Sequence, residues 1–288
     1  TNLDGWAPPV GVKTYQIAGW GEDTISGIEF YEECSQSVCE EKYRPMLVQD
    51  GDGVVPTPSA LLMPESDYTE RYWLDLTPFG VIGLLNRDHG NIFEVQNLRD
   101  FTAKLIKNET GLPSLISKTQ PPNTIQEKKL RFILHSPLTL ELFDEEENKV
   151  GIDKNGAYKS EIEGATYGEF GEVKYITVPA NQEYRLEMHG LSLGKFSLDI
   201  QEVIGNEVIE QSTIADVPST ADTEAILTIT DAIDSASALQ VDKDGDGLID
   251  FSLAPEGGET VFYQTDTLPP VTISTISGAL GQNGWYAG

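Results

Sequence analysis

The spacing of apolar residues changes along this chain and divides it into two parts of different character. In the first part, three short apolar runs precede Gly-rich or polar turns, as strands commonly do. These strand candidates are residues 13–19, 46–48 and 71–76. Between Ile92 and Ile106 apolar residues instead recur at helical spacing, which predicts an amphipathic helix of about four turns. Gly111 and Pro113 would end this helix, so the first part mixes strands with a helix.

From about residue 126 the apolar period becomes two. Apolar and polar residues alternate in several runs, and Gly, Asn and Pro turns separate them. The clearest runs hold Leu138, Leu140 and Leu142; Tyr184, Leu186 and Met188; and Phe196, Leu198 and Ile200. Closely spaced strands with no helical stretch between them predict an all-β sandwich.

The charge balance excludes some classes of partner. The chain has 19 Lys and Arg against 47 Asp and Glu, a formal net charge of -28. Such a surface repels phosphate backbones, so we expect no nucleic-acid partner. No apolar run approaches the ~20 residues of a membrane span, so we also expect no transmembrane segment. The chain starts at Thr1 without an initiator Met, and processing or truncation could have removed a signal peptide.

Two cysteines, Cys34 and Cys39, lie close together in the sequence. They are suited to a local disulfide if the protein is exported, and to two free thiols if it is not. We leave both readings open. No His or further Cys lies at the spacing of a zinc site.

The most informative pairing is Asp52, in a Gly-rich turn after an apolar run, with His89, which precedes the predicted helix. An acid followed by a strand and then a His is the order in which the last two members of a Ser-Asp-His triad occur in α/β-hydrolases. The serine would then lie upstream of this chain. Alternatively, Asp52 is an ordinary turn residue and His89 a helix-entry residue.

The residues around this pair resemble a known family. Asp50-Gly51-Asp52-Gly53-Val54-Val55-Pro56 and Asp88-His89-Gly90-Asn91-Ile92 are similar to the C-terminal catalytic segment of lecithin:cholesterol acyltransferase-like, lipase-like α/β-hydrolases. The resemblance covers about residues 10–107. It implies that Asp52 is the triad acid and His89 the triad base, and that ester or lipid is the substrate.

The sequence also contains one motif that could be mistaken for the site of a nucleophilic serine. Ser192 lies in Gly190-Leu191-Ser192-Leu193-Gly194, which fits G-x-S-x-G. A nucleophile elbow needs a strand before it and a helix after it, whereas alternating runs flank this segment on both sides. We therefore predict a β-hairpin here and no nucleophile.

The acidic run from residue 242 to 250 has calcium-loop spacing. Asp242, Asp244, Asp246 and Asp250 occupy positions 1, 3, 5 and 9, and Leu248 would offer its carbonyl at position 7. The twelfth position is Leu253 instead of the usual Glu, so the loop is not a full EF-hand; it resembles the loops of thrombospondin type 3 repeats. We predict structural Ca²⁺, against the alternative of a solvated acidic turn.

The predicted fold class is therefore mixed, with a partial α/β part followed by an all-β sandwich and a calcium-loop connector. We expect residues 1–111 to be the C-terminal part of an α/β-hydrolase domain. The further segments are a linker at 112–125, the accessory β-sandwich at 126–230, the calcium-loop region at 231–264 and the truncated start of an Ig-like β module at 265–288.

These observations lead to one functional hypothesis and two alternatives. The chain is expected to be the C-terminal fragment of a secreted or surface-attached bacterial serine acyl hydrolase or acyltransferase, inactive without the upstream remainder. The first alternative is a non-catalytic, calcium-stabilised extracellular adhesion or scaffold segment. The second is a degenerate hydrolase part that only binds.

Overall fold

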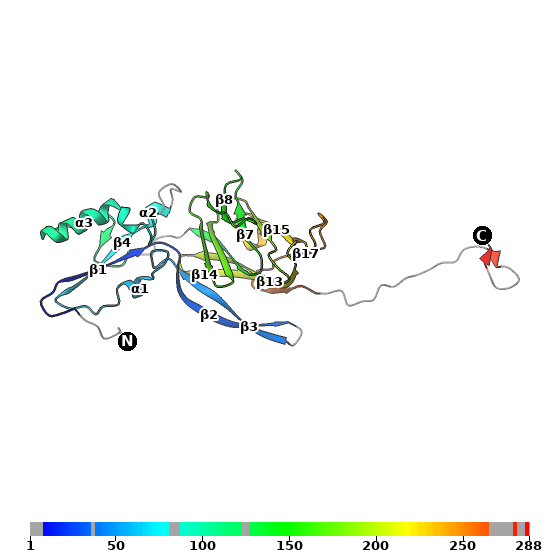
Figure 1. Cartoon of the computed structure of the whole chain (residues 1–288), viewed down its shortest axis with the longest axis horizontal. Coiled ribbons are helices and arrows are strands. Elements are labelled where there is room, and N and C mark those ends of the chain that lie inside the picture. Colours follow the sequence, from blue (N-terminus) through cyan, green and yellow to red (C-terminus); the bar gives the residue numbers. More distant parts are fainter. Residues whose placement is uncertain are drawn as a thin grey trace.

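The computed structural model describes residues 8–35, 38–80, 87–121 and 127–264, together with residues 279–280 and 286–287. It is mostly β, with about 50% strand and only 10% helix. Figure 1 shows a small lobe that contains the longest helix, a larger sandwich beside it, and a long hairpin that runs from the lobe along the sandwich.

The small lobe is built on a three-stranded sheet with the order β1-β4-β5. Strands β1 (Thr14–Trp20) and β4 (Thr69–Asp75) are parallel, and β5 (Ile116–Ser117) pairs antiparallel with β4. Its helical elements are α1 (Thr57–Ala60), α2 (Thr77–Gly80), η1 (Ile92–Glu94) and α3 (Gln96–Lys107). Helix α3 buries Leu98 and Phe101 against Tyr72 and Leu74 of the sheet, which explains the helical spacing of its apolar residues.

The sandwich consists of two sheets. The six-stranded sheet has the order β10-β11-β6-β13-β14-β18 and the seven-stranded sheet has the order β17-β16-β15-β12-β7-β8-β9. Their strands are β6 (Lys128–His135), β7 (Leu140–Phe143), β8 (Lys149–Ile152), β9 (Tyr158–Ser160), β10 (Thr166–Phe170), β11 (Val173–Pro179), β12 (Tyr184–His189), β13 (Gly194–Ile204), β14 (Glu207–Ser219), β15 (Glu224–Ile229), β16 (Leu239–Asp242), β17 (Phe251–Leu253) and β18 (Thr260–Phe262). A short 3-10 turn, η2 (Ile233–Ser235), lies between β15 and β16.

The alternating apolar residues form the core between these two sheets, as predicted. Leu138, Leu140, Leu142, Leu186, Met188, Leu198 and Ile200 are fully buried in one cluster, together with Tyr184 and Phe196. The all-β part of the predicted fold is therefore confirmed. The sandwich also extends further than expected, because β16, β17 and β18 come from residues 239–262, which we had expected to form a connector.

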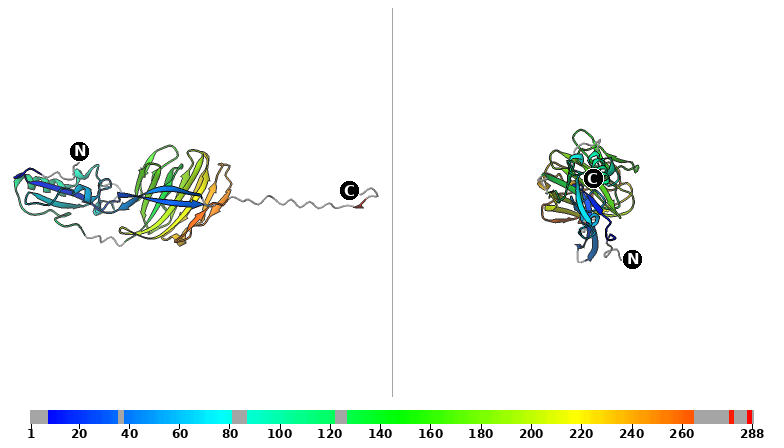
Figure 2. Two further views of the ribbon diagram at one scale, coloured as in Figure 1. Left: turned by 90° about the horizontal axis from the view of Figure 1, so that it is seen from below. Right: turned by 90° about the vertical axis from the view of Figure 1, so that its left-hand side faces the viewer.

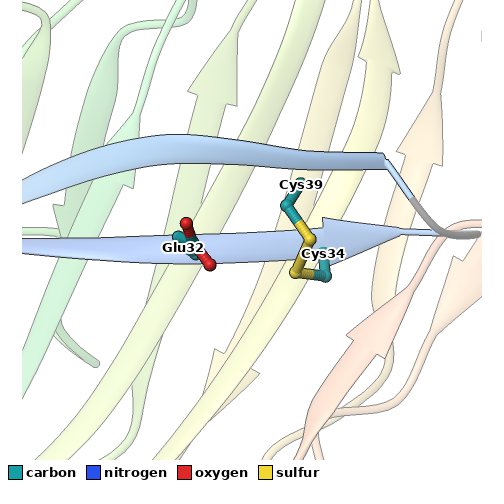
Figure 3. Close-up of side chains that lie close together, drawn as sticks. All are labelled: Glu32, Cys34 and Cys39. Atoms are coloured by element: carbon teal, nitrogen blue, oxygen red, sulfur yellow. A yellow bond between two sulfur atoms is a disulfide. The ribbon is translucent and has the colours of Figure 1, made fainter.

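A long antiparallel hairpin joins the two lobes. Strands β2 (Thr24–Ser35) and β3 (Val38–Val48) leave the small lobe and cross the face of the sandwich (Figure 2). Cys34 and Cys39 face each other across this hairpin and form a disulfide beside Glu32 (Figure 3). The structure thus has the disulfide and not the two free thiols, and both sulfurs are occupied by it.

The hairpin contacts the sandwich through an apolar cluster, in which Leu47, Ile25 and Tyr43 pack on Ile133, Val173 and Tyr175, and through a polar group beside it. The buried carboxylate of Asp199 on β13 faces Arg44 of β3 and His135 of β6, each at 3.3 Å, and accepts a hydrogen bond from Thr213 at 2.6 Å. The hydroxyl of Tyr31 on β2 lies 3.2 Å from Nε2 of the same His135. Burial acts to raise the pKa of Asp199, but His135, Thr213 and Arg44 together hold it below its ordinary value.

The resemblance of the N-terminal part to an α/β-hydrolase segment is wrong. The chain is predominantly a β-sandwich with few helices, and residues 24–48 form an antiparallel hairpin where a βα unit would be needed. The features behind the resemblance are local: a strand that ends in an Asp-Gly turn, and a His that precedes a helix. A small three-stranded sheet with a few short helical elements carries such features as well as a large doubly wound sheet does.

Two further expectations differ from the structure or fall outside it. The Ser192 segment connects β12 to β13, which belong to different sheets, so it is not the β-hairpin that we predicted. Most of the expected final β module lies outside the described residues; the part that is described holds β19 (Ala279–Leu280) and β20 (Tyr286–Ala287), which pair antiparallel. In the parts of the chain that the structure describes, no helix has the length and apolar character needed to cross a membrane.

The polar contact of the hairpin gives a prediction for stability. Arg44→Met should lower the free energy of unfolding by about 2 kcal/mol, because a buried carboxylate loses a charge-assisted hydrogen bond. The control is Lys159→Met, whose partner Glu161 is 44% exposed, and it should cost well under 1 kcal/mol. Urea unfolding measures both, and equal losses would contradict the account.

The same carboxylate sets a dependence on pH. Because the folded-state pKa of Asp199 is depressed, its contribution to stability is complete above the ordinary value of 3.8 and is lost as the pH falls below that value. In the Asp199→Asn variant, the free energy of unfolding should therefore fall less steeply as the pH is lowered below 3.8 than it does in the unsubstituted chain.

Candidate functional site

Asp52 lies in the loop that follows β3, at the base of the hairpin. Its side chain is only 8% exposed, and Oδ1 accepts hydrogen bonds from the backbone N–H groups of Val54 at 3.2 Å and Val55 at 2.7 Å. The next residue, Gly53, has φ +91°, a conformation that a side chain would strain. These bonds fix the carboxylate and leave Oδ2 available to another donor.

The end of β1 comes unusually close to this loop. A Cβ at Gly19 would lie 2.6 Å from the Cβ of Asp52, so only glycine permits the approach. The hydroxyl of Thr24, the first residue of β2, accepts a hydrogen bond from the Gly53 N–H at 2.8 Å. The loop is thereby held between β1 and the start of β2.

The structure brings His89 into direct contact with Asp52. Nδ1 of His89 lies 2.9 Å from Oδ2 of Asp52, and the His89 backbone N–H donates to the Asp52 carbonyl at 2.8 Å. An ionised carboxylate only accepts hydrogen bonds, so Nδ1 carries the proton and Nε2 keeps a free lone pair in the neutral ring. The imidazole is 49% exposed, whereas Asp52 is buried.

This arrangement is chemically suited to general-base work. The carboxylate holds one tautomer and stabilises the imidazolium that would form when Nε2 takes a proton. Within the described residues, no hydroxyl or thiol side chain forms a hydrogen bond with Nε2. The described part of the chain therefore supplies an acid and a base but no adjacent nucleophile.

A second His–Asp contact, between His135 and Asp199, has a different character. The His135 side chain is only 9% exposed and that of Asp199 1% exposed, because the hairpin covers them. A substrate in solution cannot reach His135 in this arrangement. Exposure of the imidazole thus separates His89, which a molecule in solution can reach, from His135, which joins the hairpin, β6 and β13.

Glu22 is a residue near Asp52 that the sequence did not single out. It lies two residues after the end of β1, and its N–H donates to the Gly51 carbonyl at 3.1 Å. Burial, together with the charges of Asp23 and Asp88, raises the pKa of Glu22 to about 8, and Lys129 offsets this only in part. From the sequence, Glu22 looks like a solvated turn residue, because nothing local reveals that it is buried.

Three of the five predicted calcium ligands come together. Carboxylate oxygens of Asp242, Asp244 and Asp250 lie within 4.8 Å of one another. Both oxygens of Asp242 also accept backbone hydrogen bonds, from Gly245 and Gly247 at 2.7 Å each. Asp246 is not part of this group; its Oδ1 accepts a hydrogen bond from the N–H of Leu248 at 2.8 Å.

The loop is anchored to the sandwich from outside the acidic run. The carbonyl of Lys243 accepts hydrogen bonds from the hydroxyls of Thr220 at 2.9 Å and Thr223 at 2.7 Å. A Cβ at Gly245 would lie 2.7 Å from the carbonyl oxygen of Asp222, so the loop packs closely on this turn. An ion held by Asp242, Asp244 and Asp250 would stiffen the loop between β16 and β17, which Thr220 and Thr223 hold against the turn before β15.

Comparison with known proteins adds no family to this picture: neither a protein-family model, nor a curated protein, nor a solved structure matches the chain.

The geometry of the pair predicts the effect of Asp52→Asn. The Val54 and Val55 N–H groups would keep the amide oxygen at the Oδ1 position, so the NH₂ group would face Nδ1 of His89. The ring would then have to carry its proton on Nε2, the tautomer that cannot act as a base there. Long-range ¹H–¹⁵N correlation spectra report the tautomer, and an unchanged Nδ1–H form in the variant would contradict the geometry.

Proposed function

We propose that Asp52 and His89 are the acid and base of an acyl-transfer site that acts on an ester or lipid substrate. The observation that supports this most is the 2.9 Å contact between a buried carboxylate and the inner nitrogen of a half-exposed imidazole. His89 would remove the proton of an attacking hydroxyl through Nε2 and then return it to the leaving alcohol. Asp52 would stabilise the intermediate imidazolium.

The nucleophilic hydroxyl in this proposal belongs to a serine outside the described residues. Ser192 is an unsuitable candidate, because it lies between two sandwich strands and no helix follows it. The Cys34–Cys39 disulfide supports an oxidising compartment, and so an extracellular or cell-surface location.

Activity of the full-length gene product tests the proposal. We expect it to hydrolyse p-nitrophenyl esters, and residues 1–288 alone to be inactive. His89→Ala should abolish turnover, and Asp52→Asn should lower kcat by about 10⁴-fold, as loss of the orienting carboxylate does in serine proteases. His189→Ala is the matched control, since His189 faces Glu187 and Glu224 on the sandwich, and it should leave the rate unchanged.

Two results would contradict this function. Full activity of the His89→Ala variant would remove the base from the mechanism. Turnover by residues 1–288 that is lost in Ser192→Ala would place the nucleophile in the sandwich instead.

We further propose that the Asp242–Asp250 loop binds Ca²⁺ as a structural ion. The convergence of Asp242, Asp244 and Asp250 supports this, because carboxylate oxygens are the ligands that Ca²⁺ prefers. The same site supports the alternative function, a calcium-stabilised extracellular scaffold, if the acid–base pair is inactive.

Calcium binding is measurable by titration calorimetry and by thermal unfolding. Ca²⁺ at 100 times its Kd should stabilise the folded chain by about 2.7 kcal/mol. Asp244→Asn should weaken binding without disturbing the loop, because within the described residues the backbone hydrogen bonds of the loop go to Asp242, Asp246 and Asp250 and not to Asp244. Asp234→Asn, in the exposed η2 turn, is the control and should bind normally. An absence of binding heat, with unfolding that chelator does not affect, would rule the site out.

A further inference from the structure

Glu22, Asp52 and Asp88 meet around a single glycine at the candidate site. Glu22 pairs in parallel with Asp52 through the backbone. A Cβ placed on Gly53 would lie 3.7 Å from the Cβ of Asp88 and 4.0 Å from the Cβ of Glu22. The Cβ atoms of Glu22 and Asp88 therefore both lie close to the loop that carries the Asp52 carboxylate.

The carboxyl group of Glu22 forms no salt bridge among the described residues, and the charge of Lys129 offsets its burial only in part. Glu22 is only 8% exposed, and no Lys, Arg or His within the described chain forms an ion pair with it. The charges that face it are those of Asp23 beside it, Asp88 on the His89 turn and Lys129 on β6. Asp23 is itself 3.9 Å from Arg131 and 3.3 Å from the hydroxyl of Thr166. A buried, unpaired carboxylate is costly, so the protonated form of Glu22 is the one that this position accommodates.

We propose that Glu22 is a positioning residue for the Asp52–His89 pair, and that its neutral form keeps the Asp52 loop against the end of β1. Ionisation of Glu22 would place a third negative charge beside Asp52 and Asp88. Mutual repulsion would then move the Asp52 loop away from β1 and lengthen the contact between Oδ2 and Nδ1. Its effect on turnover rests on the function proposed above, but its effect on the hydrogen bond does not.

The direction of the pH dependence follows from the raised pKa of Glu22. The folded state keeps this proton up to about pH 8, whereas the unfolded chain loses it near 4.5. The stabilisation by the neutral carboxyl is therefore present below pH 4.5 and declines as the pH rises toward 8. The Asp52–His89 hydrogen bond should be lost on the alkaline side, with a midpoint near pH 8.

The test follows the Nδ1–H signal of His89 by NMR in the chain of 288 residues between pH 6 and pH 10. Glu22→Gln, which is neutral at every pH, should keep the signal beyond the pH at which the unsubstituted chain loses it. Glu94→Gln is the matched control, because Glu94 is 62% exposed and paired with Arg87, and it should behave like the unsubstituted chain.

Two charge variants test the same idea without altering Glu22. Asp88→Asn removes a charge that raises the pKa of Glu22, so the midpoint should move to lower pH. Lys129→Met removes a charge that lowers this pKa, so the midpoint should move to higher pH. Loss of the signal at one common pH in Glu22→Gln, Asp88→Asn and Lys129→Met would overturn the proposal, and shifts of the predicted signs would support it even if Glu22→Gln fails to fold.

The pH profile of ester hydrolysis by the full-length protein separates this inference from the proposed function. If His89-dependent activity exists but its alkaline limb is unchanged in Glu22→Gln, the inference fails and the function stands. If the NMR midpoints shift as predicted but no variant shows activity, the positioning role stands and the proposed function fails.

Discussion

The docking of the β2–β3 hairpin on the sandwich is the constraint on which both lobes depend. The hairpin starts just after Glu22 and Asp23 and ends just before the Asp52 loop, so its base is the candidate site. Its body is held on the six-stranded sheet by an apolar cluster around Leu47 and by Arg44 and Tyr31, which reach Asp199 and His135. Because Arg44 and Tyr31 reach a buried carboxylate and its histidine partner, the hairpin has to dock in one position, and the Asp52 loop follows directly at its base.

The two histidine–aspartate contacts differ in how far the imidazole is buried, and this difference determines what each contact can do. In both, a carboxylate that is almost fully buried faces an imidazole. At His135 the hairpin covers the ring, and the contact joins three elements. At His89 half of the ring remains exposed, and only the inner nitrogen is occupied. The first arrangement stabilises an interface, whereas the second leaves a proton acceptor at the surface.

The core of the sandwich could be predicted from the sequence because strand period is a local signal. Leu138, Leu140 and Leu142 alternate with polar residues and are all fully buried. The helix was also visible, although Val95 separates η1 from α3. We expected Asp52 and His89 to be close because of an α/β-hydrolase fold that the structure does not have; their side chains nevertheless lie 2.9 Å apart.

The features that could not be predicted from the sequence depend on contacts between segments that are far apart along the chain. The β2–β3 hairpin is rich in glutamates and has no clean apolar alternation, so its docking could not be inferred from residues 24–48 alone. The burial of Glu22 and Asp199 arises only when the hairpin and the sandwich meet. The α/β-hydrolase resemblance failed for a related reason. Two short turn motifs specify only the local geometry of the backbone, whereas the number of strands in the sheet depends on the rest of the chain.

Labelling with a fluorophosphonate tests the central claim, that His89 is the base for a hydroxyl nucleophile, most directly. The reagent reacts with a serine only when a neighbouring base has activated it, and mass spectrometry locates the labelled residue. The account predicts a labelled serine in the full-length protein, no label within residues 1–288, and loss of the label in His89→Ala. A label on Ser192, or one that persists in His89→Ala, would contradict it.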